Sequence, residues 1–130
     1  MSYDPKYSFE HVHIYCSDLD ASEQWFIEKI GAELIRHRDP KPARATDLGL
    51  GGATLFLREE VPGENLGAAG PARFGTDHIG LRVDDLEATA TELKRRGVSF
   101  VVEPYEIRPG LRIAFIQGPD RVRIELLQRA

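Results

Sequence analysis

The apolar and polar residues of the chain follow one pattern that occurs twice. Each occurrence begins with a short stretch in which apolar and polar residues alternate, at residues 9–16 and 77–83. An alternation with a period of two predicts a strand with one buried face. A stretch with apolar residues three or four positions apart follows, which predicts a helix with one buried side. Three further apolar stretches predict three strands, so each half of the chain is expected to form a βαβββ module.

The residues at the ends of the two expected helices support this division. Ser17 or Asp18 can cap the first helix and residues 84–85 can cap the second, because short polar side chains accept hydrogen bonds from unpaired backbone N–H groups. Gly31 and Gly97 stand where each apolar stripe stops, and glycine is favoured there because a helix often ends in a left-handed conformation.

The remaining strands are expected near residues 32–38, 46–50 and 53–58 in the first half, and near residues 98–104, 111–117 and 122–128 in the second. The segment between the halves, 59–75, is rich in glycine and proline and is interpreted as a linker. We therefore expect a single α+β domain over residues 1–130, with module one at about 8–58 and module two at about 76–128. In each module the helix covers one face of the sheet, and the other face is left to curve around a cavity.

Histidines occupy equivalent positions on the first strands of the two modules. His11 and His78 are each followed by a β-branched residue, and an Asp-Leu pair begins seven residues after each histidine. The two copies are offset by 67 residues, about half the chain. Alternation places His11 and His13 on the face opposite Val12 and Ile14, away from the expected helix. Two imidazoles at equivalent places on the open faces indicate a site.

Composition narrows the class of function. The net charge is −4, from 17 basic and 21 acidic residues, so a nucleic-acid partner is not expected. The single cysteine, Cys16, excludes an internal disulfide and any zinc site made of several cysteines, and its place on the helix-facing side predicts a buried, unreactive thiol. No stretch approaches the ~18 continuous apolar residues of a membrane span, so we expect a cytoplasmic protein without a membrane partner.

Motifs of the second half are similar to those of a known superfamily. They are GTDHIGL at residues 75–81, IAFIQGPD at 113–120 and IELL at 124–127. With them, residues 8–128 resemble the vicinal oxygen chelate superfamily, which includes glyoxalase I, methylmalonyl-CoA epimerase, extradiol dioxygenases and bleomycin- or fosfomycin-resistance proteins; the second half is most similar to bacterial glyoxalase I. The resemblance implies two βαβββ modules paired into a curved mixed-sheet cup that holds a divalent metal ion, and it implies a homodimer.

The resemblance also implies a set of metal ligands. One ligand comes from the first strand and one from the last strand of each module, which here gives His11, His78 and Glu125, with Phe56 at the fourth position. Two imidazoles and a carboxylate can hold Fe, Zn, Ni, Co or Mn and leave coordination positions open. The alternative is a metal-free pocket in which the same three side chains are satisfied internally. A metal site can form within one chain or between the two chains of a dimer.

Phe56 and three neighbouring side chains are candidates for contact with a small-molecule substrate. His13 shares a strand face with His11, and it can shuttle protons, bind substrate or be a spectator. Arg82 and Arg123 share strand faces with His78 and Glu125, and they can meet an anionic substrate group or form structural salt bridges. Residues 36–44 carry a basic run that is interpreted as a solvated loop or as a steering site for an anion.

Three functions stay open at this point. A metal-dependent lyase or isomerase of the glyoxalase type, acting on a small oxygenated substrate, is favoured by the second half; Glu125 would serve as ligand and as base. An extradiol-type Fe(II) dioxygenase is favoured by the bare three-ligand set, with His13 and Tyr105 as further candidates near the metal. A metal-free small-molecule-binding protein of the resistance type is favoured by the apolar Phe56.

Overall fold

The computed structural model describes residues 3–39, 43–67 and 74–130; Lys41 of the basic run and residues 68–73 of the expected linker lie outside this part. Within these residues, eight strands and two α-helices form in the expected order. Module one comprises β1 (Val12–Cys16), α1 (Leu19–Ile30), β2 (Glu33–Arg38), β3 (Ala45–Leu50) and β4 (Ala53–Glu59). Module two comprises β5 (Ile79–Arg82), α2 (Leu86–Arg95), β6 (Phe100–Arg108), β7 (Leu111–Gln117), the short 3-10 helix η1 (Pro119–Arg121) and β8 (Arg123–Arg129).

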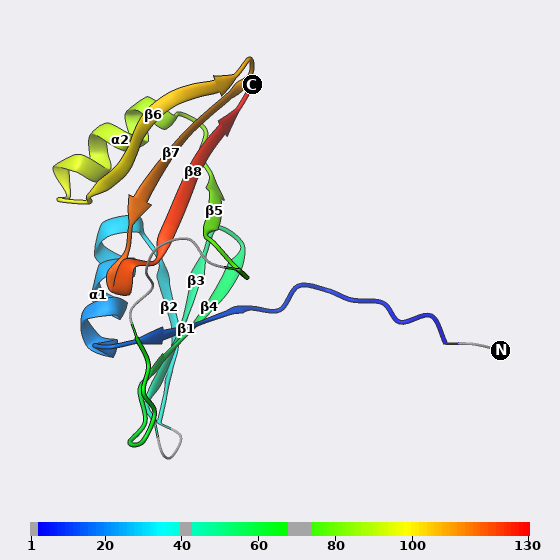
Figure 1. The fold of residues 1–130 in the computed structure, drawn as a ribbon, viewed down its shortest axis with the longest axis vertical. Coiled ribbons are helices and arrows are strands. Elements are labelled where there is room, and N and C mark those ends of the chain that lie inside the picture. Colours follow the sequence, from blue (N-terminus) through cyan, green and yellow to red (C-terminus); the bar gives the residue numbers. More distant parts are fainter. Residues whose placement is uncertain (1–2, 40–42, 68–73) are drawn as a thin grey trace.

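Both modules have the same strand order. The first sheet, sheet A, has the order β1-β4-β3-β2, and the second, sheet B, has the order β5-β8-β7-β6. In each sheet the first strand runs parallel to the last strand, and the remaining pairs are antiparallel. The expected α+β fold of two βαβββ modules is confirmed. Both helices lie on one side of the molecule (Figure 1).

The helix ends follow the sequence prediction. The Asp18 carboxylate accepts a hydrogen bond from the Ala21 backbone N–H at 3.0 Å, and Asp85 accepts one from Ala88 at 3.0 Å. Each such N-cap stabilises its helix by about 1 kcal/mol. Gly31 has a φ of 80°, the left-handed conformation that ends α1. These local signals set where each helix begins and therefore which side faces its sheet.

Each helix packs on one face of its own sheet. The fully buried side chains include Leu55 and Leu57 of β4, which lie in the same apolar core as Phe26 of α1, and Leu86 of α2, which lies with Ile124 of β8. Burying side chains of this size contributes ~1.5–3 kcal/mol each. Alternation along β4 and β8 then directs the intervening side chains to the face without a helix, where the site residues lie.

Polar contacts join the two modules near their helices. The Ser17 hydroxyl donates to Asp120 Oδ1 at 2.6 Å, and the Ser17 backbone N–H donates to Oδ2 at 3.0 Å. At the other end of α1, Lys29 Nζ donates to the Arg96 carbonyl at 2.6 Å, and Arg96 Nη1 donates to the Lys29 carbonyl at 3.1 Å. Ser17 is thus used between modules, and Asp18 alone caps α1.

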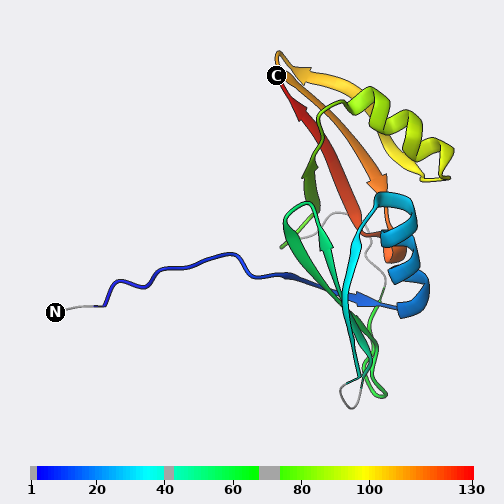
Figure 2. The ribbon, with the colours of Figure 1, turned by 180° about the vertical axis from the view of Figure 1, so that it is seen from behind.

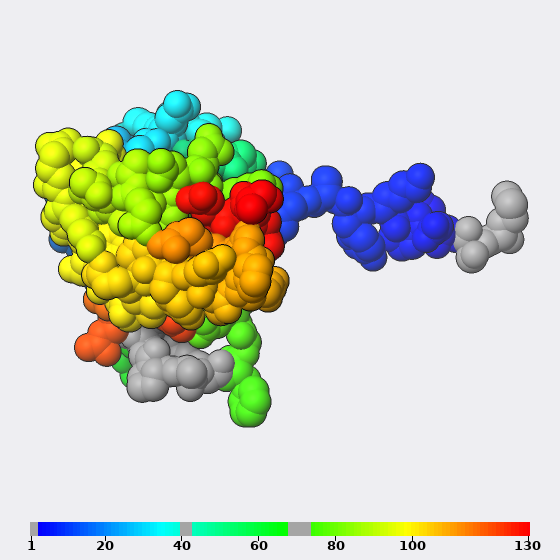
Figure 3. Space-filling view, turned by 90° about the horizontal axis from the view of Figure 1, so that it is seen from above, coloured from blue at the N-terminus to red at the C-terminus, as the bar shows by residue number. Residues whose placement is uncertain are grey.

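The first strand is shorter than the alternation predicted. It begins at Val12, which is paired with Leu55 of β4, and residues 3–10 continue as an arm away from the body on the side opposite the helices (Figures 2 and 3). Tyr7 and Phe9 in this arm are 91% and 77% exposed. The alternation of apolar and polar residues extends into this arm, but the arm has no neighbouring strand among the described residues with which to pair. Neither helix of the described chain is long and apolar enough to cross a membrane.

Candidate active site

Module two brings His78 and Glu125 into direct contact. Glu125 lies on β8, and its Oε1 is 2.9 Å from Nε2 of His78, which directly precedes β5. The other ring nitrogen of His78, Nδ1, is 2.8 Å from Oδ2 of Asp77. If Nδ1–H donates to Asp77, a neutral ring turns a lone pair toward the Glu125 carboxylate. A proton or a metal cation between Nε2 and Oε1 resolves that repulsion.

Gly80 keeps the space beside this pair open. It is the direct strand partner of Glu125 in the parallel β5–β8 pairing. A Cβ atom at position 80 would lie 3.9 Å from Glu125 Oε1 and 3.6 Å from Leu127 Cδ2. A longer side chain there would cover the carboxylate, so glycine leaves Glu125 accessible from the strand face.

Asp77 connects the pair to an arginine. Arg123 Nη1 donates to Asp77 Oδ2 at 2.9 Å, and the Arg123 guanidinium lies 4.6 Å from the centre of the Phe115 ring. The hydrogen bond with His78, together with the charge of Arg123, lowers the pKa of Asp77. Arg123 therefore forms the salt bridge that was one of its two expected roles, and it fixes the acid that orients His78.

Module one has the same strand arrangement around its histidine, but different side chains stand at the equivalent positions. His11 Nδ1 lies 3.2 Å from Glu10 Oε1, and the His11 ring stacks on Phe56 with centroids 3.8 Å apart and an interplanar angle of 19°. In the parallel β1–β4 pairing, Phe56 is the partner of His13. Gly80 and Glu125 form the equivalent pair in module two. Phe56 thus stands at the register position of Glu125, on the same face as His11.

His13 lies beside this stack, where module two has Gly80. Its ring centroid is 6.3 Å from those of His11 and Phe56. Desolvation, followed by the nearby charges of Arg58, His11 and Arg38, lowers the pKa of His13. Desolvation, helped by these positive charges, therefore favours the neutral form of the His13 imidazole.

The expected ligands form two half-sites in one chain. His78 and Glu125 meet in module two, and His11 meets Phe56 in module one. Among residues 3–39, 43–67 and 74–130, no three His, Cys, Asp or Glu side chains are close enough together to hold a metal ion. The reason is architectural, because strand pairing produces two separate four-stranded sheets and each sheet carries its own half-site.

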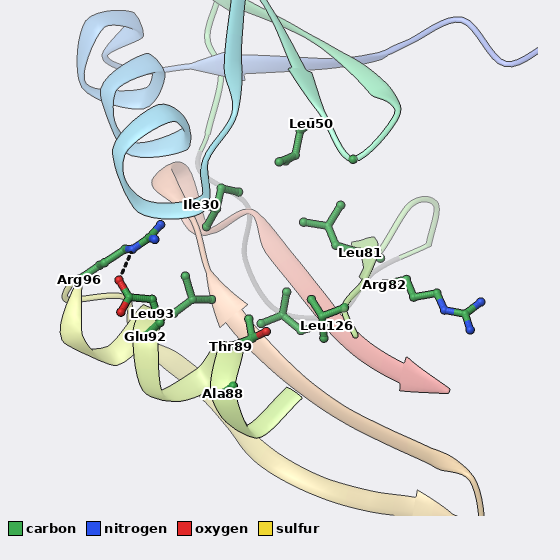
Figure 4. A pocket seen from close by; sticks show the side chains of 13 residues that line it. Ile30, Leu50, Leu81, Arg82, Ala88, Thr89, Glu92, Leu93, Arg96 and Leu126 are labelled. Carbon is green, nitrogen blue, oxygen red and sulfur yellow. Dashed lines mark hydrogen bonds and ion pairs between the residues drawn. The ribbon is translucent and has the colours of Figure 1, made fainter. Parts of the chain in front are cut away.

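A cavity of about 590 Å³ lies between the modules; Gly80 lines it, but His11, Phe56, His78 and Glu125 do not. Ile30 and Leu50 of module one face Leu81 and Leu93 of module two across it (Figure 4). Arg82 lines its edge, with the guanidinium directed away from the apolar side chains (Figure 4). The cavity has a mostly apolar lining without histidine, so the polar chemistry belongs to the open sheet faces.

Two kinds of site residue were missed from the sequence. Glu10 and Asp77 each precede a histidine and contact its Nδ1 atom, and the signal was an acid before the histidine in both copies. Asp47 on β3 is only 1% exposed and binds Arg36 and Arg38. Residues 36–38 belong to β2, in agreement with the strand expected near 32–38, so only the interpretation of this part of the basic run as a loop was wrong.

Cys16 is 2% exposed, and burial raises the pKa of its thiol. A raised pKa lowers the thiolate fraction at any given pH, so we expect a thiol reagent at pH 8 to modify the native protein at least ~100-fold more slowly than the protein unfolded in urea. Timed labelling with a chromogenic disulfide measures this directly, since the chain has one cysteine. Equal rates in the two states would contradict the buried position.

The chain matches a known superfamily over most of its length. The model of the Glyoxalase/Bleomycin resistance protein/Dioxygenase superfamily matches residues 8–126, and the chain belongs to this superfamily. It is 30% identical over 128 residues to a protein of Synechocystis sp. named "Probable lactoylglutathione lyase", covering 91% of this chain and 92% of that protein.

Solved structures agree with this assignment. A mutant of glyoxalase I from Zea mays has a TM-score of 0.79 and 29% identity, covering 94% of this chain and 44% of that chain. A glyoxylase/bleomycin resistance protein/dioxygenase domain from Frankia sp. has a TM-score of 0.80 and 22% identity, covering 97% of this chain and 100% of that chain. The similarity to the Frankia structure supports the fold alone.

Proposed function

We propose that this protein is a divalent-metal-dependent lyase or isomerase of the glyoxalase type, acting on a small oxygenated substrate. The contact between His78 Nε2 and Glu125 Oε1 at 2.9 Å carries this proposal, because it pairs two metal-binding atoms on an open sheet face. The similarity to proteins named as lactoylglutathione lyases supports the reaction class.

The donor atoms fit a divalent cation. His78 and Glu125 would hold it from module two, and His11 would hold it from module one; imidazole and carboxylate suit Fe, Zn, Ni, Co and Mn. Asp77 and Glu10 engage the Nδ1 atoms, which leaves each Nε2 for the metal, an arrangement common among metal-binding histidines. A bound cation would polarise a substrate oxygen and so make a neighbouring C–H more acidic.

The chain's own groups would then handle the proton. Glu125 is 18% exposed in its side chain and is open beside Gly80, so its carboxylate can take a proton from a substrate carbon and return it to a neighbouring one. Asp77 and Arg123 hold the His78 ring in place during this transfer. Phe56 offers no ligand atom, so it would leave one coordination position of the cation open for substrate. Its apolar ring would exclude water on the module-one side of the site.

A second copy of the chain is proposed to complete the site. Within the described residues the two half-sites lie on separate sheets, and β1 and β5 are edge strands with one neighbour each. An edge strand presents unpaired backbone groups that another chain can engage. A homodimer that joins the module-one face of one chain to the module-two face of another would bring His11 to His78 and Glu125.

A second candidate function is metal-free binding of a small molecule. The stack between His11 and Phe56 favours it, because the ring that would supply the third ligand already packs on an apolar neighbour. In this case His78 and Glu125 would form a hydrogen-bonded pair that contacts the ligand.

Elemental analysis of the purified protein, combined with size-exclusion chromatography and light scattering, tests the proposal. We expect about one Zn, Ni, Co or Mn per chain in a dimer, with isomerase activity on small 2-oxoaldehyde adducts that is lost on chelation and restored by metal. Bound iron with catechol-dependent O₂ uptake would identify a dioxygenase instead. A protein that neither retains nor binds any of these metals would support the second candidate and overturn the first.

A further inference from the structure

The face of sheet A that is not covered by a helix carries a positive charge that the described side chains do not balance. Asp47, 1% exposed, accepts from Arg36 Nη1 at 3.1 Å through Oδ2. Its Oδ1 accepts from Arg38 Nε at 3.0 Å and from Arg38 Nη2 at 2.8 Å. Two guanidinium groups therefore share one carboxylate, and in the described part of the chain Asp47 is their only acidic ion-pair partner.

This charge lies next to the half-site. Asp47 is the direct strand partner of Phe56, so both side chains lie on the face without a helix. The Arg38 guanidinium lies 4.9 Å from the centre of the Phe56 ring, which also contacts the rings of His11 and His13. A guanidinium has five N–H groups, and Arg38 uses two of them on Asp47; the others have no acceptor among the described residues.

The neighbouring arginine on this face differs. Arg58 Nη2 lies 2.8 Å from Glu64 Oε2, so its charge is compensated, and its guanidinium lies 4.6 Å from the centre of the Tyr15 ring. The uncompensated charge is therefore localised at Arg36 and Arg38. Arg38 is the one of these two that also borders the aromatic stack of the half-site.

We propose that the substrate of this site carries a carboxylate on a planar, conjugated or aromatic group, and that Arg38 binds this carboxylate while the planar group packs against the Phe56 side of module one. The inference rests on the proposed function in that it takes this face as the substrate face. A guanidinium presents parallel N–H groups that match a carboxylate, and its flat surface stacks on planar groups. Asp47 holds the arginine in place, since a buried carboxylate restrains its donors.

Binding of benzoate to metal-free protein tests this inference without any turnover. The protein is kept in EDTA, and affinities for benzoate, benzamide and acetate are measured by NMR titration of the histidine ring signals. Benzamide has the ring without the charge, and acetate has the charge without the ring. We expect benzoate to bind about tenfold or more tightly than either, because both contacts are needed.

Variants assign the contact to Arg38. Arg38→Gln is expected to reduce benzoate affinity about tenfold, to the level of benzamide, and Arg38→Lys to have an intermediate effect. Arg95→Gln is the matched control, since Arg95 is 72% exposed on α2 and pairs with Glu92. Its benzoate affinity should equal that of the wild type.

Two results would overturn the inference. One is equal affinity of wild-type protein for benzoate and benzamide, a comparison that does not depend on the folding of any variant. The other is unchanged benzoate affinity in Arg38→Gln. Either of these two results could occur while the metal content and isomerase activity agree with the proposed function. Conversely, a protein without metal or activity could still bind benzoate more tightly than benzamide. The two proposals therefore fail separately.

Discussion

Replacing His78 by alanine is expected to lower the affinity for a divalent metal by ~100-fold or more. Removing an outer partner of a metal-bound histidine already costs 10–100-fold in many sites, and His78→Ala removes a ligand itself. It also leaves Glu125 without the ring that lies 2.9 Å from it. Metal content after dialysis, and titration of the stripped protein with Zn or Co, measure the loss.

A matched control distinguishes the loss of a metal ligand from the loss of any histidine. His37 is the partner of Glu23, with Nε2 2.7 Å from Oε1, and it lies outside both half-sites. His37→Ala should therefore keep wild-type metal affinity. The metal affinity of Asp77→Asn should lie between those of His37→Ala and His78→Ala, because this substitution changes only the orientation of His78. An undiminished metal stoichiometry in His78→Ala would rule out the proposed ligand set.

Replacing Phe56 by glutamate is expected to strengthen metal binding about tenfold or more. Position 56 has the strand register of Glu125 and the same face as His11, so a carboxylate there would supply the fourth ligand that Phe56 does not. A fourth ligand also fills an open coordination position. The variant should consequently gain isomerase activity toward hemithioacetals if the cup accepts them, and it should lose any O₂ chemistry.

Two controls accompany the Phe56→Glu variant. Phe56→Leu removes the ring without adding a donor, so it should not increase metal affinity. Leu34→Glu adds the same charge to sheet A but on the opposite face, because Leu34 is paired with the core residue Leu48. If Phe56→Glu binds metal no better than Phe56→Leu at the same pH, position 56 is not part of a metal site.

The repeat in the sequence determined a large part of the structure. The offset of 67 residues, the caps at Asp18 and Asp85 and the alternation along each strand are local features, and local features are set by short-range sterics and hydrogen bonding. They correctly predicted the two βαβββ modules. The resemblance, rather than these local features, assigned His11 with Phe56, and His78 with Glu125, to the ligand positions of the first and last strands.

Tertiary structure decided how these pieces are joined. The separation of the two half-sites follows from strand pairing, which places them on two four-stranded sheets, whereas the sequence left open whether the site forms within one chain or between two. The Asp47 pair with Arg36 and Arg38 depends on the irregular register between β2 and β3, and no periodicity specifies such a register. The bond from Ser17 to Asp120 spans 103 residues of sequence. Such contacts join segments far apart in the chain, and only packing of the whole domain selects them.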